Sequence, residues 1–155
     1  MAEVHSTQMT SVTAGAKLLP SAEGGRKRLF FARYVQGGST QAINDTIYLG
    51  DLPKGARICK DWLVNCSAGT ASSTMDIGLR TKGVGGQAGT VIDADGIAAA
   101  VNTAAAGYKD ANTGALIAAG EEYVTTDVVE VYATITGAVF AANQKLTVEG
   151  SYVQD

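Results

Sequence analysis

The chain of 155 residues has one histidine, two cysteines, two prolines and one tryptophan. The histidine, His5, lies in a segment without periodicity near the start of the chain. A Ser-His-Asp or Cys-His arrangement therefore has no base that the fold can hold within about 3 Å of a nucleophile. No glycine is followed by lysine, which excludes a Walker A phosphate loop. Cys59 and Cys66 belong to no CxxC pair, so we expect free thiols and no zinc site.

Long apolar runs are also missing. An uncharged stretch such as 131–144 covers 14 residues, whereas a membrane-spanning helix needs about 20 apolar ones. The first ten residues show neither a basic nor an apolar leader, so no secretory signal is expected. The net charge of −3 argues against nucleic acid as a partner. Charge is nevertheless uneven, because residues 1–80 carry 9 basic and 6 acidic groups and residues 81–155 carry 3 and 9.

The length suits one domain, which at this size buries roughly 70% of its unfolded surface. Residues 1–25 are rich in Ser, Thr, Ala and Gly and show no sustained period. We predict that they form a flexible N-terminal arm, which is either a frayed end or a segment that orders only against a neighbour. Residues 26–155 are then the folded domain.

Most of that domain is predicted to form β-strands. Residues 26–36 carry apolar residues on both faces, which suits a strand covered twice or placed at a subunit contact. A turn is predicted at 51–55, where Pro53 fixes one φ angle and Gly55 supplies a permissive backbone. Period-two alternation marks three longer segments, 56–66, 75–80 and 127–136, and predicts one buried and one wet face for each.

The remaining segments are less regular. We predict a short alanine-rich helix over 95–103 with Asp95 near its N-cap. A last strand spans 144–153, and a turn through 137–143 is expected to join it to the preceding strand as a hairpin. Seven or eight short strands without a βαβ rhythm predict an all-β, antiparallel sandwich of jelly-roll type, with one short helical insertion.

Local motifs give little chemistry. The segment 83–88 (GVGGQA) matches a dinucleotide fingerprint loosely, but no helix start follows it. The segment 93–96 (DADG) lacks the flanking carboxylates of an EF-hand and is explained by a turn. Glu122 and Glu130 are expected on solvated strand faces, not as a catalytic pair. Trp62 is expected in the core. No catalytic residue, metal site or cofactor is predicted.

One segment of the sequence resembles a known pattern. Residues 44–58 (NDTIYLGDLPKGARI) resemble a strand-turn-strand pattern of small virion structural proteins of tailed bacteriophages. In that pattern a "D-I-G" strand follows, matched here by 75–79. An Asp-Ala-Asp segment and a "V-T-L-x-V-x-Y" closing strand come next, matched by 93–100 and 146–152. The similarity covers roughly residues 40–153.

The resemblance implies a head decoration, or cement, protein that coats the assembled capsid and reinforces it. It implies the major capsid protein and further copies of the chain as partners, with a homotrimer favoured and a dimer possible. The place it implies is the exterior of the virion, after synthesis in the host cytoplasm. By residue type, the expected capsid and subunit contacts are the arm and six residues of the following strand: Arg26, Lys27, Arg28, Phe30, Phe31 and Tyr34.

Three other functions are compatible with parts of the sequence. A tail or head-fibre accessory domain that binds a host-surface glycan would be favoured by a stalk or heptad repeat, and none is present. A small hydrolase or nucleotide-binding enzyme is disfavoured by the single histidine and the missing Gly-Lys. A carbohydrate-binding module would normally expose aromatic residues on one sheet face.

Overall fold

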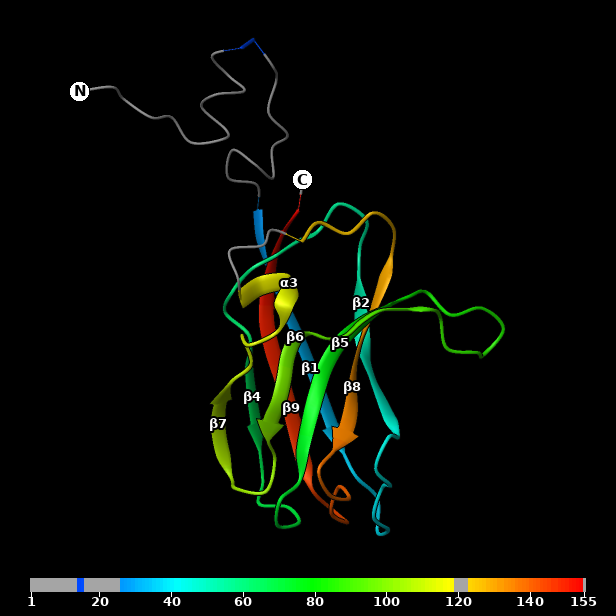
Figure 1. Ribbon diagram of the computed structural model, residues 1–155, viewed down its shortest axis with the longest axis vertical. Helices are drawn as coiled ribbons and strands as arrows, with labels where there is room; N and C mark the ends of the chain where they lie inside the picture. Colours follow the sequence, from blue (N-terminus) through cyan, green and yellow to red (C-terminus); the bar gives the residue numbers. More distant parts are fainter. Residues whose placement is uncertain (1–13, 16–25, 119–122, 155) are drawn as a thin grey trace, which may run out of the picture.

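The computed structural model describes residues 14–15, 26–118 and 123–154. Within those residues the chain forms nine strands and one helix of a single turn (Figure 1). The elements are β1 (Arg26–Val35), β2 (Thr46–Leu52), β3 (Arg57–Ile58), β4 (Leu63–Cys66), β5 (Thr74–Thr81), β6 (Val91–Asn102), β7 (Gly107–Asp110), α3 (Ala115–Ala118), β8 (Val129–Thr136) and β9 (Lys145–Gln154). The predicted arm 1–25 lies outside the described residues, apart from Ala14 and Gly15.

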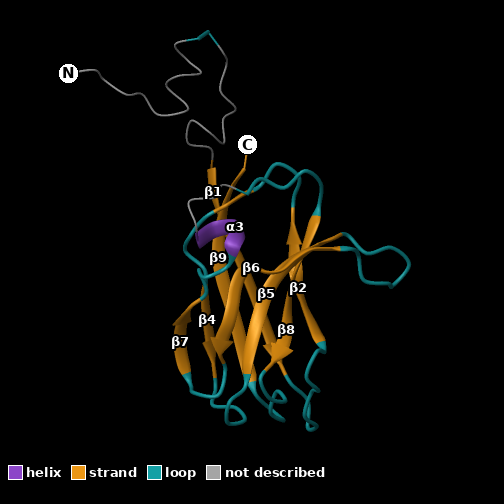
Figure 2. Ribbon diagram, in the orientation of Figure 1, coloured by secondary structure: helices purple, strands orange, loops and turns teal. Residues whose placement is uncertain are grey.

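The strands form two antiparallel sheets packed face to face (Figure 2). Sheet A has the order β1-β9-β4-β7, with the short β3 also beside β9, and sheet B has the order β2-β8-β5-β6. With β3 set aside, the first strand pairs with the last, the second with the next to last, and so inward to β5 and β6. This nested pairing is a long hairpin rolled into two sheets, the jelly roll. The predicted all-β, jelly-roll-like sandwich is confirmed.

Period-two alternation places the core between the sheets. Met75, Ile77 and Leu79 of β5 are fully buried, as the alternation predicts. Trp62 is fully buried too, and its ring lies 5.0 Å from that of Phe30 on β1. A strand that turns every second side chain inward buries its apolar residues without a helical cover.

The turn after β2 forms as predicted. Gly55 adopts a φ of 80°, in the left-handed region that favours glycine. Thr125, which is buried, fixes this turn from across the fold. Its hydroxyl donates to the Pro53 carbonyl at 2.6 Å and accepts from the Ala56 N–H at 2.9 Å. The turn thereby joins the end of β2 to the segment that precedes β8.

The predicted helix over 95–103 is wrong, because this segment is the second half of β6. β6 pairs with β5, with Ala98 opposite Ile77, and Ile97 enters the core. The helix propensity of alanine amounts to a fraction of a kcal/mol per residue, which pairing and burial exceed. The one helix of the described residues is α3, after Gly114, and no helix there is long and apolar enough to cross a membrane.

The predicted hairpin through 137–143 is also wrong. β8 belongs to sheet B and β9 to sheet A, so this connection crosses from one sheet to the other. Phe140 in the middle of the connection is fully buried and forms a β-bridge with Gln41. The connection thus closes one end of the core instead of turning back along the same sheet.

The predicted strand over 56–66 divides into β3 and β4. Ile58, Trp62, Val64 and Cys66 are buried, as the alternation predicts. At the break between the two strands, the backbone N–H of Trp62 donates to Oδ1 of Asn112, a residue distant in the sequence, at 2.7 Å. Both cysteines of the chain are free.

Replacement of Gly150 by alanine should destabilise the domain by about 1–3 kcal/mol. Gly150 lies on β9, and a Cβ added there would overlap the buried Trp62 indole, which has little room to move. Urea unfolding measures the change. Gly38→Ala is the matched control, because nothing lies within 4 Å of its added Cβ. Equal stability of both variants would contradict this account of the core.

Candidate functional site

β1 is an edge strand with one side open. It pairs with β9 along all of its residues, and among the described residues no strand pairs with its other side. The Gln36 N–H donates to the Gln144 carbonyl at 2.9 Å, which fixes the phase of the ladder. Even-numbered residues of β1 therefore bond to β9, and the N–H and C=O groups of odd-numbered residues point away from it. The open edge is about 33 Å long.

The odd-numbered residues of β1 also point their side chains outward from sheet A. Leu29 and Phe31 are 71% and 60% exposed, and Val35 is exposed as well. Tyr108 of β7 lies on the same outer face, because Arg33, Thr147, Asn65 and Tyr108 face one another in register across the four strands. A shallow cleft of about 340 Å³ runs beside Phe31 and Arg33.

The six predicted contact residues of β1 differ in their exposure to solvent. Arg26, Lys27, Arg28 and Phe31 are exposed, Tyr34 is half-buried, and Phe30 packs in the core against Trp62. Phe30 is therefore not available for a contact in the folded chain. Three exposed hydrophobic residues of this face are not among the six: Leu29 and Val35, which belong to the predicted strand 26–36, and Tyr108. Alternation counted outward from a buried Phe30 would have indicated the first two.

Asp61 ties the start of β1 to its neighbours. Its carboxylate accepts from Lys27 at 2.7 Å and from the Ser151 hydroxyl and N–H at 2.7 and 3.0 Å. Partial burial alone would raise the pKa of Asp61, but the hydrogen bonds from Lys27 and Ser151 outweigh it, and the pKa lies below its usual value. Lys27 is thus directed across β9, away from the open edge of β1, by an interaction within the chain.

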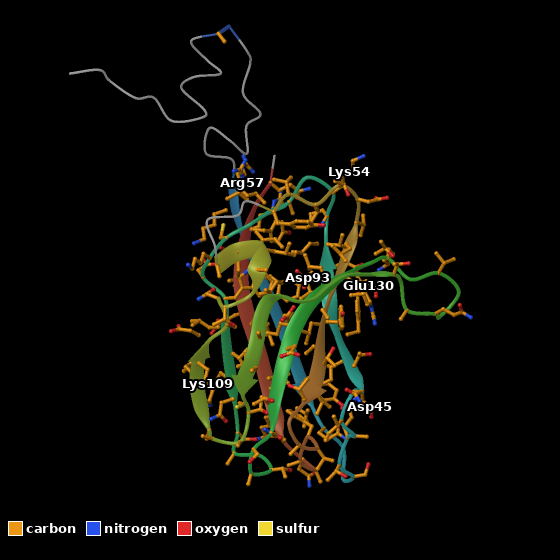
Figure 3. The ribbon with its side chains drawn as sticks, in the orientation of Figure 1. Asp45, Lys54, Arg57, Asp93, Lys109 and Glu130 are labelled. Carbon is orange, nitrogen blue, oxygen red and sulfur yellow. The ribbon has the colours of Figure 1, made fainter. Side chains whose placement is uncertain are left out.

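A buried ion pair lies on the outer face of sheet B. Arg80 Nε of β5 donates to Glu130 Oε2 of β8 at 2.6 Å, and the Arg80 guanidinium stacks 4.9 Å from the centre of the Tyr132 ring. Glu130 also accepts from the Gly83 N–H at 3.0 Å. Figure 3 shows Glu130 at the root of the connection between β5 and β6, which projects from the sandwich.

The expected solvated position of Glu130 is wrong, since the residue is only 7% exposed. Glu122, named with it, lies outside the described residues. Burial of Glu130 would raise its pKa, but the Gly83 N–H and Arg80 outweigh this, so the pKa lies below its usual value. Alternation alone placed Glu130 and Arg80 on a wet face, and could not reveal that the two side chains neutralise and cover each other.

A cleft of about 380 Å³ lies between this ion pair and the projecting connection. Lys82 pairs with Asp51, whose carboxylate also accepts from the Tyr48 hydroxyl at 2.9 Å. The glycine-rich segment 83–88 joins two antiparallel strands here, so it lacks the strand-to-helix turn of a dinucleotide site. Among the described residues, no group of three or more His, Cys, Asp or Glu could hold a metal ion.

Comparison with known protein families and with curated protein sequences finds no match to the chain. Two solved structures share the fold. A chain of the capsid of Ralstonia phage GP4 has 19% identity and a TM-score of 0.67, over 84% of this chain and 86% of that chain. A chain of the cyanophage Pam1 capsid asymmetric unit has 16% identity and a TM-score of 0.60, over 85% of this chain and 87% of that chain. The likeness extends over nearly the whole jelly roll.

Replacement of Arg80 by methionine should destabilise the domain at neutral pH by about 2–3 kcal/mol, because it leaves the Glu130 carboxylate buried without its cation. The loss should shrink as the pH falls through the raised pKa of the unpaired Glu130, since protonation removes the buried charge. In the natural chain the stability should change with pH in the opposite direction. Because the pKa of Glu130 is lowered in the folded chain, its ionised form stabilises the fold at pH values above the ordinary pKa of a glutamate. That contribution is lost as the pH falls further.

Urea unfolding at several pH values measures both effects. The control is the double variant Arg80→Met with Glu130→Gln, which keeps an acceptor for the Gly83 N–H but carries no buried charge. It should be more stable than Arg80→Met at neutral pH. A single variant whose loss is independent of pH would contradict the role given to the Glu130 charge.

Proposed function

We propose that the chain is a bacteriophage virion structural protein, and that it decorates and stabilises the outside of the capsid. The observation that carries this proposal is the shared jelly roll, which covers more than four fifths of both chains in the comparisons with the GP4 and Pam1 capsids. The pattern in residues 44–58, which resembles small virion proteins, supports the same assignment independently of the fold.

The surface suits a protein that binds its partner over a broad contact area and not in a deep pocket. The outer face of sheet A combines exposed apolar side chains, Leu29 and Phe31, with the cations Lys27 and Arg33. Contiguous exposed apolar groups rimmed by charge are typical of interaction surfaces. A module repeated around a shell needs only modest affinity at each contact, because many simultaneous contacts add avidity.

The two contact regions have different partners in this proposal. The arm 1–25 reaches the major capsid protein, and β1 with its neighbours on sheet A meets another copy of the chain. The protein then acts as a homo-oligomer, with a trimer favoured at a local threefold position of the lattice. Such an arrangement ties adjacent capsid subunits together and resists the internal pressure of packaged DNA.

Purified protein should bind to expanded phage heads that lack it and should raise the temperature at which those heads rupture. Co-sedimentation measures the binding, and thermal release of packaged DNA measures the stabilisation. Heads already carrying a full complement of the protein are the control and should take up none. Absence of binding at micromolar concentration would overturn the decoration function.

Deletion of residues 2–25 should weaken attachment to heads at least about tenfold, a loss of roughly 1.4 kcal/mol. The unfolding temperature should stay within about 4 °C of the full chain, because β1 begins only at Arg26. A chain in which residues 2–25 are scrambled controls for length and composition. Unfolding of the truncated chain, or undiminished attachment, would contradict the role of the arm.

A further inference from the structure

The open edge of β1 is basic as well as apolar. Arg26, Arg28 and Arg33 are exposed, and among the described residues none of them forms an ion pair, whereas Lys27 is held by Asp61. Exposed hydrophobic edge strands invite pairing with another chain, and cations on the edge restrict which chain can pair. A suitable partner strand is therefore apolar and acidic.

The first half of β6 has that composition. Val91 and Ile92 are exposed apolar residues, and Asp93 and Asp95 follow them on the same strand. Asp93 is labelled in Figure 3, at the end of β6 near the projecting connection. The pKa of Asp95 is raised by its hydrogen bond with Asp93, by partial burial, and by the charges of Asp93 and Asp76. The carboxylates thus repel one another, and a cation brought near them would relieve this repulsion.

Only part of the outer edge of β6 is open. From Asp95 onward its backbone is covered by the segment before α3, where Gly114 lies against the backbone of Asp95 and Gly96. The Gly114 N–H donates to the Ile97 carbonyl at 2.9 Å, and the Ala99 N–H donates to Thr113 Oγ1 at 2.9 Å. Among the described residues, no strand pairs with this edge over 91–94, and the Asp95 side chain beside it is exposed. The open part is therefore the part that carries the exposed apolar and acidic side chains.

The jelly roll separates the two edges. β1 ends sheet A beside β2, and β6 ends sheet B beside β7, so β1 and β6 lie at opposite sides of the sandwich. One copy of the chain cannot satisfy both edges by itself. A second copy, oriented alike, presents its acidic β6 edge to the basic β1 edge of the first.

We propose that copies of this chain associate head to tail, with the β1 edge of one copy docked on the 91–94 edge of β6 of the next. A twofold antiparallel contact between two β1 strands is disfavoured, because it brings two basic edges together and places Lys27 close to the partner subunit's Arg33. A head-to-tail contact closes into a ring when its rotation allows. The proposal specifies the subunit contact of the proposed function, but the protein alone suffices to test it.

Sedimentation velocity of the full chain tests the proposal. The protein should associate at about 0.05 M salt and less so at about 0.5 M, because the contact is partly electrostatic. Arg28→Glu with Arg33→Glu, and separately Asp93→Lys with Asp95→Lys, should each weaken self-association at least about tenfold. Lys54→Glu, at the exposed turn after β2, reverses a charge that belongs to neither edge and should associate normally.

Mixing the two reversed variants decides the geometry. The first variant has two acidic edges and the second two basic ones, so each should be monomeric alone and the mixture should form assemblies in which the two variants alternate at one-to-one stoichiometry. A chain carrying all four substitutions should associate with itself again. Asp95→Lys alone serves in place of the double reversal if circular dichroism shows that variant to be unfolded.

A wild-type chain that stays monomeric at millimolar concentration and low salt would overturn the head-to-tail contact. So would association that survives both reversals, or reversed variants that fail to pair with each other. Binding of the monomeric chain to phage heads would in that case still support the decoration function. Failure of the subunit contact and failure of the proposed function are thus distinguishable.

Discussion

The pairing of β1 with β9 is the constraint on which the rest of the fold depends. The two strands match along their whole length, from Arg26 opposite Gln154 to Val35 opposite Lys145, although every other strand lies between them in the chain. This pairing closes the nested hairpin and seals Phe30 against Trp62. Because this pairing joins the two ends of the domain, it closes a very long loop at a large cost in chain entropy. That cost falls when the inner strand pairs have already formed.

The same nesting sets where the charges of the chain are displayed. β1 belongs to the outermost pair and β6 to the innermost pair, and the two-sheet wrap puts these strands at opposite sides of the sandwich. The excess of basic residues in the first half of the sequence and of acidic residues in the second half thereby becomes a difference between two edges. The charge asymmetry of the sequence is therefore not dispersed over the surface. It separates across the sandwich, with Arg28 at one side and Asp95 at the other.

Sequence reasoning succeeded where burial follows a simple period and failed where it depends on distant partners. Alternation at Met75, Ile77 and Leu79 identified their strand and its inner face, and Pro53 with Gly55 located a turn. The alanine-rich part of β6 was misassigned because the pairing with β5 that holds it is invisible locally. The crossing of 137–143 between sheets was missed for the same reason. Which face of β1 lies open is decided by Phe30, which packs against the distant Trp62 on the inner face.

The two outer faces of the sandwich differ in how completely the chain covers them. On sheet B, Glu130, Arg80 and Tyr132 are buried by one another and by the root of the projecting connection, so a partner would gain little by covering them again. On sheet A, Leu29 and Phe31 remain in water, although the strand that carries them is one of the longest in the fold. Apolar groups left exposed on a regular, rigid strand can be covered by a partner at little entropic cost. The outer face of sheet A therefore offers a partner exposed apolar area that the outer face of sheet B around Glu130 does not.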